Sequence, residues 1–297
     1  MTVRSILTVL VGGEGDAAAL GCSVRVARHS GAHIAAVSAV SSNGAVGDLG
    51  LLPEEGGSAV MLEFEKRAKE RATRARAAFD TFVRTEAVTI SDRPKLEDNV
   101  TASLEEIDDA PDSVVEHLGG AYDLIVVGQP ERVSGGMAGS GLLNERIFET
   151  ATFSTGRPVL VAPAKTPAML GETVLIGWNR SAQAARAFHA SKALLLNRAR
   201  RVRIVSVTTG AKDGPPAERI AENLAWHGID CDVRELSPDN RSVGTVLLAE
   251  ASAIGADLLV AGAYTHSRLR QLLLGDVTQS LLAEAEIPLF FAHDGRE

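Results

Sequence analysis

The chain has 297 residues, which is enough for two domains of ordinary size at roughly 150 residues each. Hydrophobic residues make up 45% of the chain and charged residues 23%, a balance typical of a folded globular protein. The net charge of −8 argues against general binding to nucleic acid or to anionic membranes, because both depend on positive charge.

The N-terminal segment and the cysteines indicate where the protein works. The first apolar run, Ile6 to Val11, is too short for the core of a signal peptide or for a membrane span. The two cysteines, Cys22 and Cys231, have no CxxC spacing and form no disulfide framework, so we expect buried thiols. The sequence therefore predicts a cytoplasmic protein.

An internal repeat organises the chain. Three pairs of segments recur in the same order: TVLVG at 8–12 and TVLIG at 173–177, DLIVVG at 123–128 and DLLVAG at 257–262, RPVLVAPA at 157–164 and IPLFFAHD at 287–294. The offset is 165 for the first pair and 134 for the second, so the first copy carries 165 − 134 = 31 additional residues in its middle. We expect two domains of one kind, residues 1–166 and 167–297.

The additional residues of the first copy fall in an insertion near 41–85. A Gly-rich loop is predicted over 41–58, and a long helix over Ala59–Val83. Basic residues crowd this helix, but Glu63, Glu65 and Glu70 are interspersed among them, which favours a solvated face over a site for an anionic partner. The linker between the copies is predicted near 163–171, where two prolines and a glycine occur.

In the second copy, short β-branched runs alternate with helical patterns. Strands are predicted at Thr173–Trp178, Val202–Thr208, Asp230–Leu236, Asp257–Ala263 and Ile287–Ala292. Helices are predicted between them at Ser181–Leu196, Pro216–His227, Val243–Ile254 and Val277–Ala285. Continuous apolar strands joined by helices indicate an α/β fold, a doubly wound parallel five-stranded sheet in each copy.

With this repeat, the chain resembles the tandem universal stress proteins, which are built from two UspA-like domains. The resemblance covers nearly the whole chain outside the insertion. Its most specific element is THSRLRQLLLGDVT at 265–278, which is similar to the stretch G-H-S-R-x-R-E-x-x-L-G-G-V-T of many two-domain bacterial members. The resemblance implies the UspA-like fold, which shares its architecture with the adenine nucleotide alpha hydrolases, and a non-enzymatic role in the stress response.

Nucleotide-binding members of the family share a pattern G-x2-G-x9-G-[ST] after the fourth strand and an Asp in the loop after the first. Glycines let the backbone approach a polyphosphate, and the following helix N-terminus supplies N–H donors. Carried over to this chain, the pattern implies that ATP or another adenine nucleotide would contact the second copy without a metal, at Asn179, Gly262, Thr265, Gly275, Asp276 and Thr278.

Three of these positions depart from the pattern. Thr265 replaces the middle glycine, Asn179 replaces the loop Asp, and Asp276 stands where the hydroxyl is expected. The carboxylate of Asp276 would repel an incoming phosphate, so the site is predicted to be degenerate. The first copy is further from the pattern, because Leu142 follows Gly141, and we expect SGGMAGSG at 134–141 to be a flexible connector and not an anion nest.

Signs of catalysis are weak, so we expect a protein that is not an enzyme. The seven histidines show no metal-ligand spacing, and no G-x-S-x-G elbow stands at a strand–helix turn. The Gly-rich loop VGGEGDAAA at 11–19 is similar to the pyrophosphate-binding loop of ATP pyrophosphatases, but it lacks that loop's serines. An enzyme of this kind is kept as a minor alternative.

Two functions therefore remain open. One is a regulator that senses adenine nucleotide through its C-terminal half. The other is a scaffold that binds no nucleotide and offers surfaces for self-association and for partner proteins. The resemblance implies pairing through the fifth strands, which a tandem chain can achieve internally between 159–162 and 289–292, and a monomer or a homodimer would both be compatible with it.

Overall fold

The computed structural model describes residues 3–39, 58–93, 99–130, 132–133, 136–137, 140–195, 199–208, 214–263 and 276–293. Of the loop predicted over 41–58, residues 41–57 lie outside these ranges, and Ser58 begins a helix. The strands of the first half are β1 (Ser5–Leu10), β2 (His33–Ala39), β3 (Thr89–Ile90), β4 (Thr101–Ile107), β5 (Leu124–Gly128), β6 (Arg132–Val133), β7 (Gly136–Met137) and β8 (Val159–Ala162). Those of the second half are β9 (Thr173–Gly177), β10 (Arg201–Val207), β11 (Cys231–Leu236), β12 (Leu258–Gly262) and β13 (Leu289–Ala292).

The helices follow the predicted pattern closely. They are α1 (Asp16–Ala27), α3 (Ser58–Glu86), α4 (Pro111–Leu118), the 3-10 turn η1 (Gly119–Ala121), α5 (Ser140–Ser154), α6 (Ala182–Leu195), α7 (Ala217–Ala225), α8 (Val243–Ile254) and α9 (Asp276–Glu284). All five strands and four helices predicted for the second copy are present, with bounds that differ by at most two residues. In the first copy, β6 and β7 form a short antiparallel pair where a flexible connector was expected.

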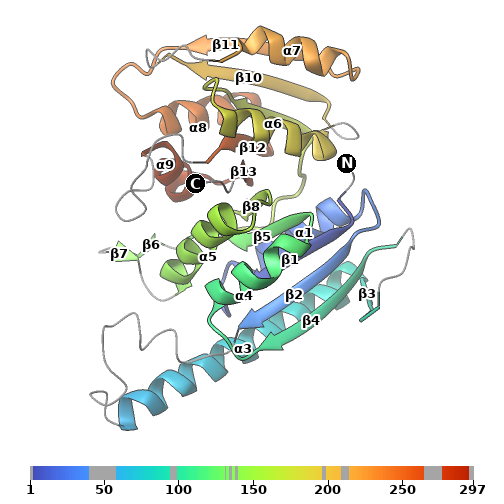
Figure 1. Ribbon diagram of the computed structural model, residues 1–297, viewed down its shortest axis with the longest axis vertical. Helices are drawn as coiled ribbons and strands as arrows, with labels where there is room; N and C mark the ends of the chain where they lie inside the picture. Colours follow the sequence, from blue (N-terminus) through green and yellow to red (C-terminus); the bar gives the residue numbers. More distant parts are fainter. Residues whose placement is uncertain are drawn as a thin grey trace.

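One sheet of eleven strands runs through the molecule, in the order β11-β10-β9-β12-β13-β8-β5-β1-β2-β4-β3 (Figure 1). Within each half the neighbouring strands are parallel, as the α/β fold class requires. The halves meet where β8 and β13 pair antiparallel, with Leu160 opposite Phe290. The two five-stranded sheets expected from the sequence are therefore joined into one, with the short β3 added at the outer edge of the first half.

Helices cover both faces of this sheet and enclose two apolar layers. On one face α1, α3, α6 and α7 pack through buried side chains such as Leu20, Phe79, Phe188 and Leu224. On the other face α4, α5, α8 and α9 do so through side chains such as Phe148 of α5, whose ring meets that of Phe291 on β13 edge to face, with the ring centroids 5.4 Å apart. Few aromatic residues are available, so Val, Leu, Ile and Ala fill most of both layers.

The repeated Asp at the start of β5 and β12 has the same structural role in both halves. Asp123 accepts hydrogen bonds from the backbone N–H of Arg4 and Ser5, at 2.8 and 3.0 Å. Asp257 accepts from the N–H of Gly171 at 2.7 Å and of Glu172 at 3.1 Å. Each carboxylate thus fixes the chain as it enters the first strand of its half.

Three further observations concern the edge strand β11, the two cysteines and the hydrophobicity of the helices. β11 is an edge strand with partly exposed side chains, although its sequence suggested a buried one. Cys22 is buried, which raises the pKa of its thiol to about 12, whereas Cys231 on β11 is only half-buried. Across the part of the chain that the structure describes, we find no helix with both the length and the apolar character needed to span a membrane.

Candidate functional site

The strand order places a switch point in the second half. From β9 the chain winds outward to β10 and β11, and it then returns to β12 on the other side of β9. The helices that leave the carboxyl ends of β9 and β12, α6 and α9, lie on opposite faces of the sheet. Doubly wound folds bind their ligands at such a position. We call the ends of β9 and β12, with the turn 178–181 and the first turn of α9, the C-terminal switch point.

Gly262 ends β12 and lies against the first turn of α6. A Cβ atom added at this position would lie 2.5 Å from the backbone nitrogen of Ala184 and 2.8 Å from the carbonyl carbon of Gln183. Only glycine therefore allows this approach between strand and helix. The residue was predicted to make room for a phosphate; in the structure the space beside its Cα is taken by the α6 backbone.

The turn after β9 is held by its own side chains. Asn179 Oδ1 accepts from the backbone N–H of Ser181 at 3.2 Å and from its hydroxyl at 2.7 Å. Ser181 Oγ in turn accepts from the N–H of Ala184 at 3.1 Å, which caps the N-terminus of α6. The side-chain oxygen of Asn179, expected to face a nucleotide, is thus bonded within this turn.

A neighbouring segment covers the same turn from the side. The indole Nε1 of the buried Trp178 donates to the carbonyl oxygen of Pro215 at 2.9 Å. Gly214, at φ +93°, lies so close to the carbonyl of Arg180 that a side chain there would collide with it. Sequence reasoning did not identify Trp178, Ser181 or Gly214. Trp178 and Gly214 link the turn to a separate segment, and Ser181 acts within the turn by bonding Asn179 and capping α6.

The first turn of α9 supplies the remaining described positions. Asp276 begins the helix and its side chain is exposed, so water screens its charge. Thr278 is buried, with 3% of its surface accessible, and it therefore packs within the fold. Thr265 and Gly275 lie outside the described residues. The structure thus brings Asn179 and Gly262 to the ends of adjacent strands, with Asp276 and Thr278 on the helix that follows β12.

The corresponding region of the first half lies at the ends of β1 and β5, and its Gly-rich loop bonds to its own helix. Asp16 is only 3% exposed, and its carboxylate accepts from the N–H of Val11 at 3.1 Å and of Gly12 at 2.9 Å. These are N–H groups that a pyrophosphate-binding loop would offer to its ligand. The geometry therefore does not favour the pyrophosphatase alternative.

The long helix α3 also packs on this loop. Arg74 Nε donates to the carbonyl oxygen of Gly12 at 2.7 Å, and a side chain at position 12 would collide with the backbone of Arg71. Burial and the neighbouring arginines lower the pKa of Arg71 below the usual value for a guanidinium, with burial the larger cause. The helix predicted as a solvated basic face therefore turns part of that face inward, against the loop after β1.

Comparison with known proteins shows what the chain is similar to. Residues 233–293 match the model of the universal stress protein family. A universal stress protein from Archaeoglobus fulgidus DSM 4304 superimposes with a TM-score of 0.69 at 15% identity, covering 99% of this chain and 97% of that chain. A functionally unknown protein from Pseudomonas aeruginosa PAO1 gives a TM-score of 0.54 at 12% identity, with 99% and 93% covered. No curated protein matches the chain in sequence.

These findings define the class. Residues 233–293 are similar to universal stress proteins, and the chain as a whole has the fold of the Archaeoglobus protein. The family resemblance seen in the sequence is thereby confirmed for residues 233–293 by the family match, and for the rest of the chain at the level of the fold.

Proposed function

We propose that the chain is a non-enzymatic regulator of the stress response that binds an adenine nucleotide at the C-terminal switch point. One observation carries the proposal: the winding direction reverses between β9 and β12, and Gly177 and Gly262 end these adjacent strands. The family match over residues 233–293 includes β12, α9 and β13, which form one side of this point.

The described groups at the switch point are suited to bind an anion with modest affinity. The N-termini of α6 and α9 direct backbone N–H groups and positive dipole ends toward the carboxyl edge of the sheet. Asp276 places a negative charge at one of these ends. Because that carboxylate is exposed, solvent and salt reduce its repulsion, and we expect binding to be weakened and not abolished.

Calorimetry with ATP, ADP and AMP tests this proposal. We expect measurable heat at millimolar nucleotide, and several-fold tighter binding in the Asp276→Ser variant because a negative charge leaves the helix N-terminus. Glu284→Gln is the matched control, since it removes one charge from the exposed opposite end of α9. Absence of both heat and thermal stabilisation would remove the nucleotide from the proposal. Equal affinity in the two variants would contradict the electrostatic explanation.

A scaffold remains the second candidate, favoured by one surface feature. Trp226, directly after α7, has 89% of its surface exposed, and α7 packs beside the edge strand β11. A large exposed aromatic side chain beside an unpaired strand edge is typical of a surface that meets another protein. If this surface joins two copies, light scattering will show a dimer that Trp226→Ser converts to a monomer. An unchanged mass in this variant would contradict self-association through Trp226.

A further inference from the structure

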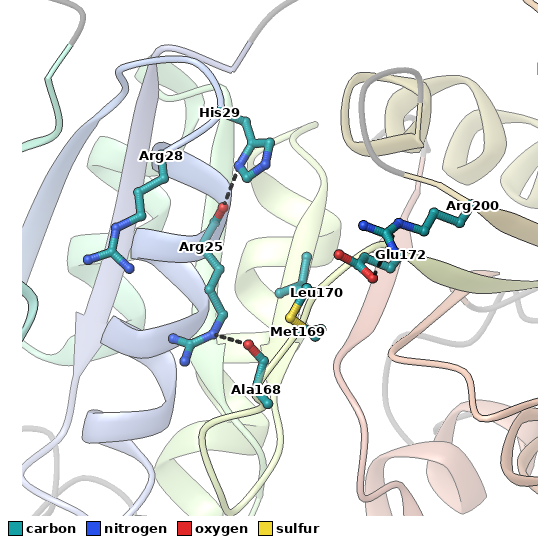
Figure 2. Close-up of a pocket in the computed structure, with 8 residues that line it drawn as sticks. All are labelled: Arg25, Arg28, His29, Ala168, Met169, Leu170, Glu172 and Arg200. Carbon is teal, nitrogen blue, oxygen red and sulfur yellow. Dashed lines mark hydrogen bonds and ion pairs between the residues drawn. The ribbon is translucent and has the colours of Figure 1, made fainter.

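A cavity lies between the two halves, away from the C-terminal switch point. Its volume is about 360 Å³ and it lies at the C-terminal end of α1, beside the starts of β9 and β10 (Figure 2). Its walls are Arg25, Arg28 and His29 from the first half, Ala168, Met169 and Leu170 from the linker, and Glu172 and Arg200 from the second half. The ends of β9 and β12 that form the switch point contribute none of these residues.

The lining of the cavity has a net positive charge, whereas the whole chain has a net charge of −8. Its walls carry three arginines and one glutamate, and Glu86 also reaches Arg28 at 2.8 Å and Arg25 at 4.0 Å. With both glutamates counted, the sum is +3 − 2 = +1 before any charge on His29. Such a site concentrates anions that the rest of the surface repels.

The two arginines on the first-half wall are held in place, Arg28 by Glu86, and Arg200 on the second-half wall can turn toward a ligand. Arg25 donates to the carbonyl oxygens of Gly21 at 2.8 Å and of Ala168 at 3.3 Å, which fixes it against the linker. Arg200 has 81% of its side chain exposed, and its ion pair with Glu172 is loose, at 3.7 Å. An exposed pair of this kind contributes little to stability, so exchanging it for a ligand contact costs little.

The geometry points to an inter-domain site for a small organic phosphate. Guanidinium groups bind phosphate oxygens through paired, charge-assisted hydrogen bonds. The partly exposed Met169 and the buried Leu170 provide an apolar wall for the carbon skeleton of the ligand, as the close-up shows. The volume lies at the lower end of the range of roughly 300–1,000 Å³ found for small-molecule sites. A ligand here touches both halves and the linker, and it therefore stabilises their arrangement.

Ribose 5-phosphate is a suitable probe, because it carries a phosphate and a small carbon skeleton but no adenine. We expect it to bind the full chain at constant ionic strength, more tightly than inorganic phosphate does, and to raise the melting temperature. Arg200→Ala should weaken binding about tenfold, the effect of losing one charged hydrogen-bonding group. Arg219→Ala removes a similarly exposed arginine on α7 (70% against 81%) and is the matched control, expected to change affinity less than twofold.

Any of three outcomes would overturn this assignment: the full chain fails to bind ribose 5-phosphate, it binds inorganic phosphate as tightly as ribose 5-phosphate, or Arg200→Ala and Arg219→Ala lose the same amount of affinity for ribose 5-phosphate. The nucleotide site is tested separately. Asp276→Ser should leave ribose 5-phosphate binding unchanged, and Arg200→Ala should leave ATP binding unchanged, so the failure of one proposal does not imply failure of the other.

Discussion

Replacing Gly262 by alanine tests the packing that shapes the C-terminal switch point. The added Cβ would lie 2.5 Å from Ala184 N, 2.8 Å from Gln183 C and 3.0 Å from Ala184 Cα. Ordinary contact begins at 3.4 Å, so the first turn of α6 must move by 3.4 − 2.5 = 0.9 Å. All three atoms belong to the backbone, and no side-chain rotation relieves the clash. Overpacking of this kind costs about 1–3 kcal/mol, and we expect a loss in the upper part of that range.

Urea and thermal unfolding of the full chain measure this loss. Gly120→Ala is the matched control, because its Cβ would meet only the carbonyl oxygen of Thr155, at 3.8 Å. There we expect no loss, or a gain of about 0.4–1 kcal/mol from the less flexible unfolded chain. If Gly262→Ala is as stable as Gly120→Ala, the close approach between β12 and α6 is not as described, and the shape inferred for the switch point must be abandoned.

Three further predictions concern buried polar groups. Arg203→Leu should lower the free energy of unfolding by about 2 kcal/mol, because it leaves the nearly buried Glu250 without the guanidinium that lies 2.6 Å away. In urea unfolding, the double variant with Glu250→Leu should recover much of this loss. Asp257→Ala should lower the free energy of unfolding by about 2 kcal/mol in the same assay, since the N–H groups at the entrance to β9 lose their shared acceptor. An unchanged urea midpoint would contradict this. Burial lowers the pKa of His33, whose neutral ring bonds Thr101 Oγ1 at 2.9 Å. As the pH falls, the unfolded chain therefore takes up the proton before the folded chain does, and the free energy of unfolding should fall as pH drops through about 6.5. The His33→Gln variant should lose less stability between pH 7 and pH 5, which unfolding at these two pH values measures.

Much of the fold could be predicted because the signals that specify it are local. Continuous apolar runs such as 257–263 mark buried strands, and three pairs of repeated segments in the same order reveal the duplication. The repeated Asp123 and Asp257 belong to these segments, although their shared hydrogen-bonding role became visible only in the structure. The pairing of β8 with β13 was expected only from the family resemblance, since nothing in either segment specifies its partner.

The details of the sites depended on contacts between distant segments. The position of Asp16 in the chain suggests an ordinary first-turn carboxylate, but its oxygens accept from N–H groups that precede it. The basic helix was predicted to face solvent, yet Arg74 reaches Gly12, 62 residues away. The arginine-lined cavity combines residues from three separate segments, and no motif spans them. Spacing within one segment cannot reveal such combinations.

The antiparallel pairing of β8 with β13 has a consequence for how the protein behaves in the cell. Both strands belong to one polypeptide, so their association is intramolecular and is governed by an effective concentration that the linker sets. Two separate single-domain copies joined through the same strands would come apart on dilution. This chain keeps its halves together at any expression level, and a ligand held between them meets a fully assembled protein even when only a few copies are present.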